Sequence, residues 1–156
     1  MIAVLQRAAG AAVRVAGKTV GEIGHGLLVL LGVGTEDTET DAELLCKKIA
    51  ACRIFTDEAD KMNLSVRDVG GSVLVVSNFT LLANYSHGNR PEFFAAARPE
   101  QANRLYEYFV ELMRREGLPV ATGEFGADMK IELHCDGPVT IVMDSEKLKK
   151  KKEKAQ

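Results

Sequence analysis

The chain of 156 residues contains no tryptophan, only four prolines and only three cysteines. Cys46, Cys52 and Cys135 are odd in number and form no C-x-x-C pair, so the sequence indicates neither a disulfide framework nor a cysteine-based zinc site. No group of residues predicts a metal or a cofactor. This cysteine usage is typical of a reducing compartment, and we expect a cytoplasmic protein.

Long apolar segments are also missing. No run approaches the roughly 18 residues of a membrane-spanning helix. The opening stretch MIAVLQRAAGAAVRV is interrupted by Gln6 and Arg7, so we expect no signal peptide and no membrane partner. A chain of this length with 46% hydrophobic residues suits a single domain with its own core.

The charge is divided unevenly along the chain. The last eleven residues, 146–156, hold six lysines and two glutamates; 20 less 6 leaves 14 basic residues elsewhere, and 22 less 2 leaves 20 acidic ones. An acidic body does not hold nucleic acid by charge alone, so any RNA must be bound locally. We expect residues 1–145 to form the domain and residues 146–156 to be a disordered, lysine-rich tail that contributes a few phosphate contacts.

Apolar periodicity predicts strands over most of the chain. Val13, Val15 and Val20 flank a turn at residues 16–18, as in a hairpin, and the run 27–33 predicts a strand buried on both faces. Further strands are expected from residue 72, and near residues 119–125, 129–135 and 139–145. Residues 57–71 are polar and rich in turn formers, which predicts a loop.

Two segments carry helix signals. Over residues 40–52, Thr40 and Glu43 have the spacing of a capping box, and apolar residues recur on one face. A second helix is expected from Pro99, in the first turn, to Gly117, which ends it. Together these elements predict an α+β domain with a curved, largely antiparallel sheet and two flanking helices.

Several motifs for catalysis fail on inspection. Gly32 and Gly34 precede a helix, but acidic residues follow them where a phosphate loop needs lysine. His134 and Cys135 are adjacent on a predicted strand, so their side chains point to opposite faces. His25 and His87 lie in turn-rich surroundings without a visible Ser or Asp partner.

The stretch Ser77-Asn78-Phe79-Thr80-Leu81 stands at the end of the strand that begins near residue 72. It places two hydroxyl groups and turning backbone N–H groups where a central strand leaves the sheet. Such backbone donors hold a developing oxyanion in many hydrolases. Ser and Thr at strand ends also commonly satisfy the backbone, so both interpretations stay open.

Three stretches together resemble one family: SNFTL at 77–81, HGNRPEFFAAARP at 87–99 and CDGPVT at 135–140. They are similar to the D-aminoacyl-tRNA deacylases, whose usual signatures are Ser-Gln-x-Thr-Leu and Asn-x-Gly-Pro-x-Thr. The resemblance covers residues 1–144 and excludes the lysine tail. Asn78 stands where the family has Gln, and Cys135 where it has Asn.

The resemblance implies a homodimer of a barrel-like α+β fold that hydrolyses the ester between a D-amino acid and the terminal ribose of tRNA. It also implies a cis bond between Gly137 and Pro138, which each subunit inserts into its partner's pocket to exclude L-amino acids. Glycine lacks a Cβ and would be rejected poorly, so glycyl-tRNA mischarged on tRNA-Ala is an expected second substrate. The implied catalytic segment is Ser77, Asn78, Phe79 and Thr80, and the implied substrate-binding residues are Arg7, Leu81, Phe125, Met129, Cys135, Gly137, Pro138 and Thr140.

The implied chemistry uses backbone N–H groups around Phe79 and Thr80 to polarise the ester, while the ribose 2′-hydroxyl assists an attacking water. Thr80 as a covalent nucleophile is the alternative, but the sequence offers it no evident base. Arg7 would brace the Gly-Pro segment, or it is a surface charge. Phe125 and Met129 would wall an adenosine pocket, or they fill the core.

Three other functions remain open. A non-catalytic RNA-binding or replication-associated module of the same fold would leave both D- and L-aminoacyl esters intact. A related deacylase with relaxed chirality would carry a trans Gly-Pro bond. A thiol hydrolase built on Cys135 and a histidine would lose its activity when cysteines are alkylated.

Overall fold

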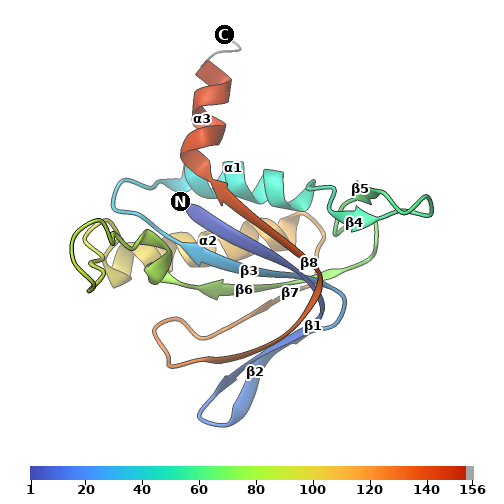
Figure 1. Cartoon of the computed structure of the whole chain (residues 1–156), viewed down its shortest axis with the longest axis horizontal. Coiled ribbons are helices and arrows are strands. Elements are labelled where there is room, and N and C mark those ends of the chain that lie inside the picture. Colours follow the sequence, from blue (N-terminus) through green and yellow to red (C-terminus); the bar gives the residue numbers. More distant parts are fainter. Residues whose placement is uncertain (154–156) are drawn as a thin grey trace.

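The computed structural model describes residues 1–153 and consists of a curved sheet with helices on one side (Figure 1). The strands are β1 (Ile2–Val15), β2 (Lys18–Ile23), β3 (Gly26–Gly32), β4 (Phe55–Thr56), β5 (Met62–Leu64), β6 (Ser72–Ser77), β7 (Val120–Thr122) and β8 (Lys130–Asp144). The helices are α1 (Glu39–Ala50), the short 3₁₀ helix η1 (Phe79–Leu82), α2 (Pro99–Arg115) and α3 (Ser145–Glu153). No helix in the described residues is long and apolar enough to cross a membrane.

The six-stranded sheet has the order β2-β1-β3-β6-β7, and β8 pairs with the other edge of β1. All pairs that involve β1 are antiparallel, whereas β3 with β6 and β6 with β7 run parallel. The predicted α+β class is confirmed, and the expectation of a largely antiparallel sheet holds only for the half around β1. The parallel half follows from the crossover connections through α1 and α2.

The sheet curls until β2 approaches β7, which makes it a nearly closed barrel (Figure 1). Gly21 of β2 permits this approach, because a Cβ at that position would lie 2.1 Å from the carbonyl oxygen of Thr122 in β7. The predicted hairpin is confirmed: β1 and β2 are joined by Ala16 and Gly17, both with positive φ (50° and 77°). Paired positive φ values are typical of the tight turns that match strand twist.

Helices α1 and α2 pack on one face of the sheet and bury the main core. Leu45 and Ile49 of α1, and Leu105 and Phe109 of α2, are fully buried there. Helix α2 begins at Pro99 and is followed by Gly117 at φ 80°, as its sequence predicted. Helix α1 is confirmed, but its predicted cap is wrong: Thr38 is the N-cap, and its N–H donates to Asp41 Oδ2 at 2.9 Å.

Two segments differ from their predictions. Residues 57–71, expected to be a loop, contain β5, which pairs with β4 to form a small separate sheet. Helix α3 spans residues 145–153, which include most of the segment expected to be a disordered tail, and it adds a third helix to the two predicted. Residues 154–156 of that tail lie outside the described residues.

A buried polar cluster attaches α3 to α1. The Asp41 carboxylate is fully buried; its Oδ1 accepts hydrogen bonds from Ser145 Oγ at 2.6 Å and from Lys149 Nζ at 2.7 Å. Burial of this carboxylate raises its pKa, but hydrogen bonds from Lys149, Ser145 and Thr38 prevail and lower the pKa of Asp41 to about 2. The Met1 amine joins the cluster through Asp37 Oδ1 at 2.6 Å and Ser145 Oγ at 2.8 Å.

Strand β8 also departs from its prediction. Residues 130–144 form one strand, where separate strands near residues 129–135 and 139–145 were expected. In the pairing with β1, Gln6 is opposite Thr140 and Ala8 is opposite Cys135, so the four residues 136–139 face Arg7 alone. The strand therefore bulges at Gly137-Pro138 without ending there.

Candidate active site

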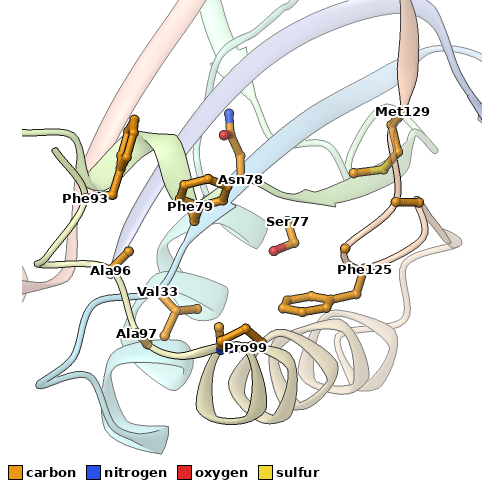
Figure 2. Close-up of a pocket in the computed structure, with 13 residues that line it drawn as sticks. Val33, Ser77, Asn78, Phe79, Phe93, Ala96, Ala97, Pro99, Phe125 and Met129 are labelled. Carbon is orange, nitrogen blue, oxygen red and sulfur yellow. The ribbon is translucent and has the colours of Figure 1, made fainter. Parts of the chain in front are cut away.

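A concave pocket of about 540 Å³ opens where β6 leaves the sheet (Figure 2). Its walls come from the end of β6, η1, the segment before α2, the first turns of α2 and the loop between β7 and β8. The lining residues are Val33, Ser77, Asn78, Phe79, Phe93, Ala96, Ala97, Pro99, Ala102, Phe125, Gly126, Ala127 and Met129. The lining is mostly apolar, as in pockets that bury a flat organic group.

Two pairs of aromatic rings shape this pocket. Phe79 and Phe93 contact edge to face, with ring centroids 5.2 Å apart, and Phe79 is 56% exposed at the mouth. Phe125 lies on the opposite side beside Met129 and packs on Tyr106 with centroids 6.0 Å apart (Figure 2). Tyr106 donates its hydroxyl to the carbonyl of Val75 at 2.9 Å, and burial raises its pKa to about 12, so it stays a neutral support of the wall.

The chain turns sharply at the polar end of the pocket. The N–H of Asn78 still donates to Leu31 O in the sheet at 2.8 Å, and the next residue begins η1. Gly32 allows η1 to lie over β3, because a Cβ there would be 2.6 Å from Leu82 Cδ2 and 3.0 Å from Asn78 O.

This turn leaves two backbone donors free. Within the described residues, the N–H groups of Phe79 and Thr80 have no hydrogen-bond acceptor, as expected for the first residues of a helix. Thr80 Oγ1 donates to Asn78 Oδ1 at 2.5 Å. A pair of unoccupied N–H groups beside an apolar pocket is suited to stabilise a carbonyl oxygen that gains negative charge.

A second set of predicted residues lies around the bulge of β8. The bond between Gly137 and Pro138 is cis, as the resemblance implied, and both residues are exposed. Arg7 lies beneath them with its side chain 11% exposed: its Nε contacts both the carbonyl oxygen and the carboxylate of Asp136 at 3.2 Å, and its Nη1 donates to Ile54 O at 2.8 Å. Arg7 is thus a largely buried brace of this segment and not a surface charge.

Gln6 is a member of this set that sequence reasoning missed. Its Oε1 accepts hydrogen bonds from Thr140 Oγ1 at 2.6 Å and from Cys135 Sγ at 3.6 Å. Gln6 could have been found in the sequence because it is a polar residue next to Arg7 in a strand whose other neighbouring residues are apolar. The contact of Cys135 is with an amide oxygen, not with a histidine, so it is not arranged as a thiol nucleophile with its base.

The structure therefore brings the predicted residues together in two places. Ser77, Asn78, Phe79, Phe125 and Met129 line the pocket, and Thr80 and Leu81 follow in η1. Arg7, Cys135, Gly137, Pro138 and Thr140 meet on β8 and β1. Strands β1 and β3 separate β8 from β6 in the sheet, and no residue of the β8 set lines the pocket of the same chain.

Sequence reasoning missed most of the small residues of the pocket, including Ala96, Ala97 and Ala102. The signal for Ala96 and Ala97 was the alanine-rich stretch before Pro99, which leaves room where larger side chains would fill the space; Ala102 lies beyond that stretch, near the start of α2. No group of three or more His, Cys, Asp or Glu residues in the described part of the chain is arranged to hold a metal ion.

Comparisons with known proteins show which proteins this chain is similar to. A sequence model of the family described as D-Tyr-tRNA(Tyr) deacylase matches residues 4–144. The D-aminoacyl-tRNA deacylase of Geobacter sulfurreducens is 57% identical over 145 residues, which are 93% of this chain and 95% of that protein. The protein of the same name from Yersinia enterocolitica is 57% identical over 141 residues, which are 90% and 97% of the two chains.

Two solved structures share the fold. One, named c-Myc DNA Unwinding Element Binding Protein, is 41% identical, with a TM-score of 0.86 over 92% of this chain and 98% of that one. The other, described as a probable eukaryotic D-amino acid tRNA deacylase, is 18% identical, with a TM-score of 0.80 over the same shares, and supports the fold alone. On the family match and the relatives above 50% identity, this chain belongs to the D-Tyr-tRNA(Tyr) deacylase family.

Proposed function

We propose that this protein hydrolyses the ester that joins a D-amino acid to the terminal ribose of tRNA, releasing the free amino acid and the tRNA. The observation that supports it best is the pair of free N–H groups of Phe79 and Thr80 at the mouth of an apolar pocket. An ester hydrolase needs donors of this kind where the tetrahedral oxyanion forms. The pocket beside them has the size and the aromatic walls that a purine base requires.

In this mechanism the terminal adenosine enters between the Phe79–Phe93 pair and the Phe125–Met129 wall. The ester carbonyl then points at the two N–H groups, and the ribose 2′-hydroxyl assists the attack of a water molecule on the carbonyl carbon. Thr80 is not the nucleophile, because its hydroxyl donates to an amide oxygen, which is not a general base. Ser77 and Asn78 position the turn.

The acting unit in this proposal is a homodimer. Gly137 and Pro138 are exposed on a braced bulge, and the pocket of the same chain does not include them. Placed in the partner's pocket, their backbone would hold the α-amino group and leave no room for an L side chain. Rejecting L-esters a thousandfold corresponds to roughly 4 kcal/mol. Because glycine has no side chain to exclude, glycyl-tRNA, including that mischarged on tRNA-Ala, is a second proposed substrate.

Two further expectations belong to this proposal. The lysine-rich C-terminal segment contributes contacts to tRNA phosphates, with Lys147 as an exposed lysine of α3 in the described part. The protein acts in the cytoplasm, where tRNA is charged.

The test compares purified protein on D-Tyr-tRNA and L-Tyr-tRNA. We expect rapid release of D-tyrosine and release of L-tyrosine at least a hundredfold slower, a difference of about 2.7 kcal/mol or more in transition-state stabilisation. The proposal would be refuted if D-tyrosine and L-tyrosine were released equally fast, or if neither were released.

The structural relative that is named for binding a DNA unwinding element favours a second candidate, a nucleic-acid-binding module without catalysis. This candidate predicts that both esters stay intact while the protein still binds nucleic acid. The same assay, combined with a binding measurement on uncharged tRNA and duplex DNA, separates the two.

A further inference from the structure

The segment between η1 and α2, residues 83–98, carries the two most exposed aromatic side chains of the described chain. Tyr85 is 80% exposed and Phe94 is 87% exposed. Asn84 and Glu92 pair through two backbone hydrogen bonds of 2.9 and 3.0 Å, so the segment is a hairpin-like loop, which we call the aromatic loop. It stands out from the body at the end opposite β4 and β5, between η1 and α2 (Figure 1).

The aromatic loop is continuous with the pocket. Phe93, the residue before Phe94, contacts Phe79 at the pocket mouth, and Ala96 and Ala97 line the pocket wall. A polymer whose last residue occupies the pocket must leave through this mouth. The side chain of Phe94 is therefore placed next to the path of the preceding residues.

The charges of the loop suit a polyanion. Arg90 and Arg98 are exposed, and neither forms an ion pair with any residue of the described chain. The acid of the loop, Glu92, accepts the N–H of Phe94 at 2.7 Å and so helps to set the conformation of the loop. Exposed aromatic rings next to cations are the usual means of holding single-stranded nucleic acid, and this loop supplies them on a body whose overall charge is acidic.

Building on the proposed function, we propose that the aromatic loop binds the single-stranded nucleotides that precede the terminal adenosine of the tRNA substrate. Phe94 stacks on the base next to the adenosine, Tyr85 supports a more distant base, and Arg90 and Arg98 contact the connecting phosphates. Stacking of this kind tolerates any base, which suits an enzyme that accepts many tRNAs.

The test measures kcat and KM on two substrates: D-Tyr-tRNA, and the minimal ester D-tyrosyl-adenosine, which has no preceding nucleotides. Phe94→Ala should raise KM for D-Tyr-tRNA about 5- to 10-fold and leave both constants for the minimal ester unchanged. Phe94→Trp should restore the wild-type KM, because it restores the ring. Met62→Ala is the matched control, since Met62 is an apolar side chain, 60% exposed, on β5 at the other end of the molecule.

Arg90→Gln gives an independent readout. It should lower the slope of log KM against log salt for D-Tyr-tRNA by about one, the value for a single lost phosphate contact, and should not affect the minimal ester.

Three results would overturn the aromatic-loop proposal: an unchanged KM of Phe94→Ala for D-Tyr-tRNA, an equal change on both substrates, or a change in mass by light scattering that identifies Phe94 as a contact between copies of this chain. Failure of the proposed function itself looks different, because the wild-type protein would then hydrolyse neither ester.

Discussion

The pocket at η1 and the bulge of β8 are built in opposite ways. The pocket is concave and mostly apolar, and beside it lie two backbone N–H donors without partners in the described residues. The bulge is convex and exposed, and polar side chains from β1 hold it on both sides: Arg7 at Asp136 and Gln6 at Thr140. A cavity with unused donors and a braced projection outside that cavity have complementary shapes, and this contrast is the basis of the proposal that the complete site forms between two copies of the chain.

The largest expected effect comes from Gly137→Ala, which tests whether the shape of the bulge matters. Gly137 has φ of +130°, and a Cβ there would lie 2.8 Å from both the backbone nitrogen and the Cγ2 of Val139. The backbone must therefore shift, and a displacement of about 1 Å at a site costs roughly 100-fold in rate. We expect kcat/KM for D-Tyr-tRNA to fall by about that factor.

The control for this variant is Gly17→Ala. Gly17 also has a positive φ of 77°, but a Cβ there would meet nothing within 4 Å. It should lose some stability and keep its activity. If Gly137→Ala were as active as Gly17→Ala, the bulge would not be part of the site.

Arg7→Ala asks whether the bulge must be held rigid. The variant removes the contacts to Asp136 and Ile54, and charge-assisted hydrogen bonds of this kind contribute about 1.5–3 kcal/mol each. We expect kcat/KM for D-Tyr-tRNA to fall about tenfold and the preference for the D-ester over the L-ester to shrink.

Arg14→Ala is the matched control for Arg7→Ala. Arg14 also joins β1 to β8, through Glu132 at 3.0 Å, but both side chains are about half exposed. Its effect on activity should be within about twofold, since exposed pairs contribute little. Equal losses in the two variants would mean that any contact between β1 and β8 matters and that Arg7 has no special role.

Thr80→Val tests the claim that the pocket works through its backbone. The substitution removes a hydroxyl that bonds Asn78 and leaves both N–H groups in place. We expect less than a tenfold loss in kcat, where removal of a nucleophile costs several orders of magnitude. Near-complete inactivation, in a variant that unfolds at the wild-type temperature, would restore Thr80 as the nucleophile.

The sequence predicted those elements whose signals are local. Pro99 and Gly117 bound α2, Ala16 and Gly17 make the hairpin turn, and an unbroken apolar run marks β3. Separate strands were expected on the two sides of Gly137-Pro138, because a Gly-Pro pair usually interrupts a strand. Only the pairing with β1, more than 120 residues away in the chain, shows that four residues bulge opposite Arg7.

The same limit applies to the site and to α3. The SNFTL segment was identified, but the alanines of the opposite wall carry no chemistry and are recognised only from the space that they leave. A run of lysines favours disorder on composition alone. Helix α3 depends instead on Ser145 and Lys149 contacting Asp41, more than 100 residues earlier, and composition cannot reveal such a contact.

The smallest effect on activity is expected at the Asp41 cluster, on which neither half of the site depends. The pKa of the Asp41 carboxyl is lowered from 3.8 to about 2. The ionised carboxylate therefore contributes its full stabilisation above about pH 4, and this stabilisation is lost as the pH falls toward 2. At pH 7, Asp41→Asn should lower the free energy of unfolding in urea by roughly 2 kcal/mol. The difference in the free energy of unfolding between wild type and variant should narrow between about pH 4 and about pH 2.5. The kcat/KM of the variant at pH 7 should differ from wild type by less than about twofold.

Glu146→Gln is the control for Asp41→Asn, because Glu146 contacts the same Lys149 at 2.7 Å but is 55% exposed. Its effect should be at most about 0.5 kcal/mol, since exposed pairs are weak. A stability gap for Asp41→Asn that did not depend on pH would mean that packing, and not the ionised carboxylate, holds α3 on α1. If Asp41→Asn lost as much activity as Arg7→Ala, the activity would depend on a cluster that belongs neither to the pocket at η1 nor to the bulge of β8. The comparison of these two regions would then not account for the site.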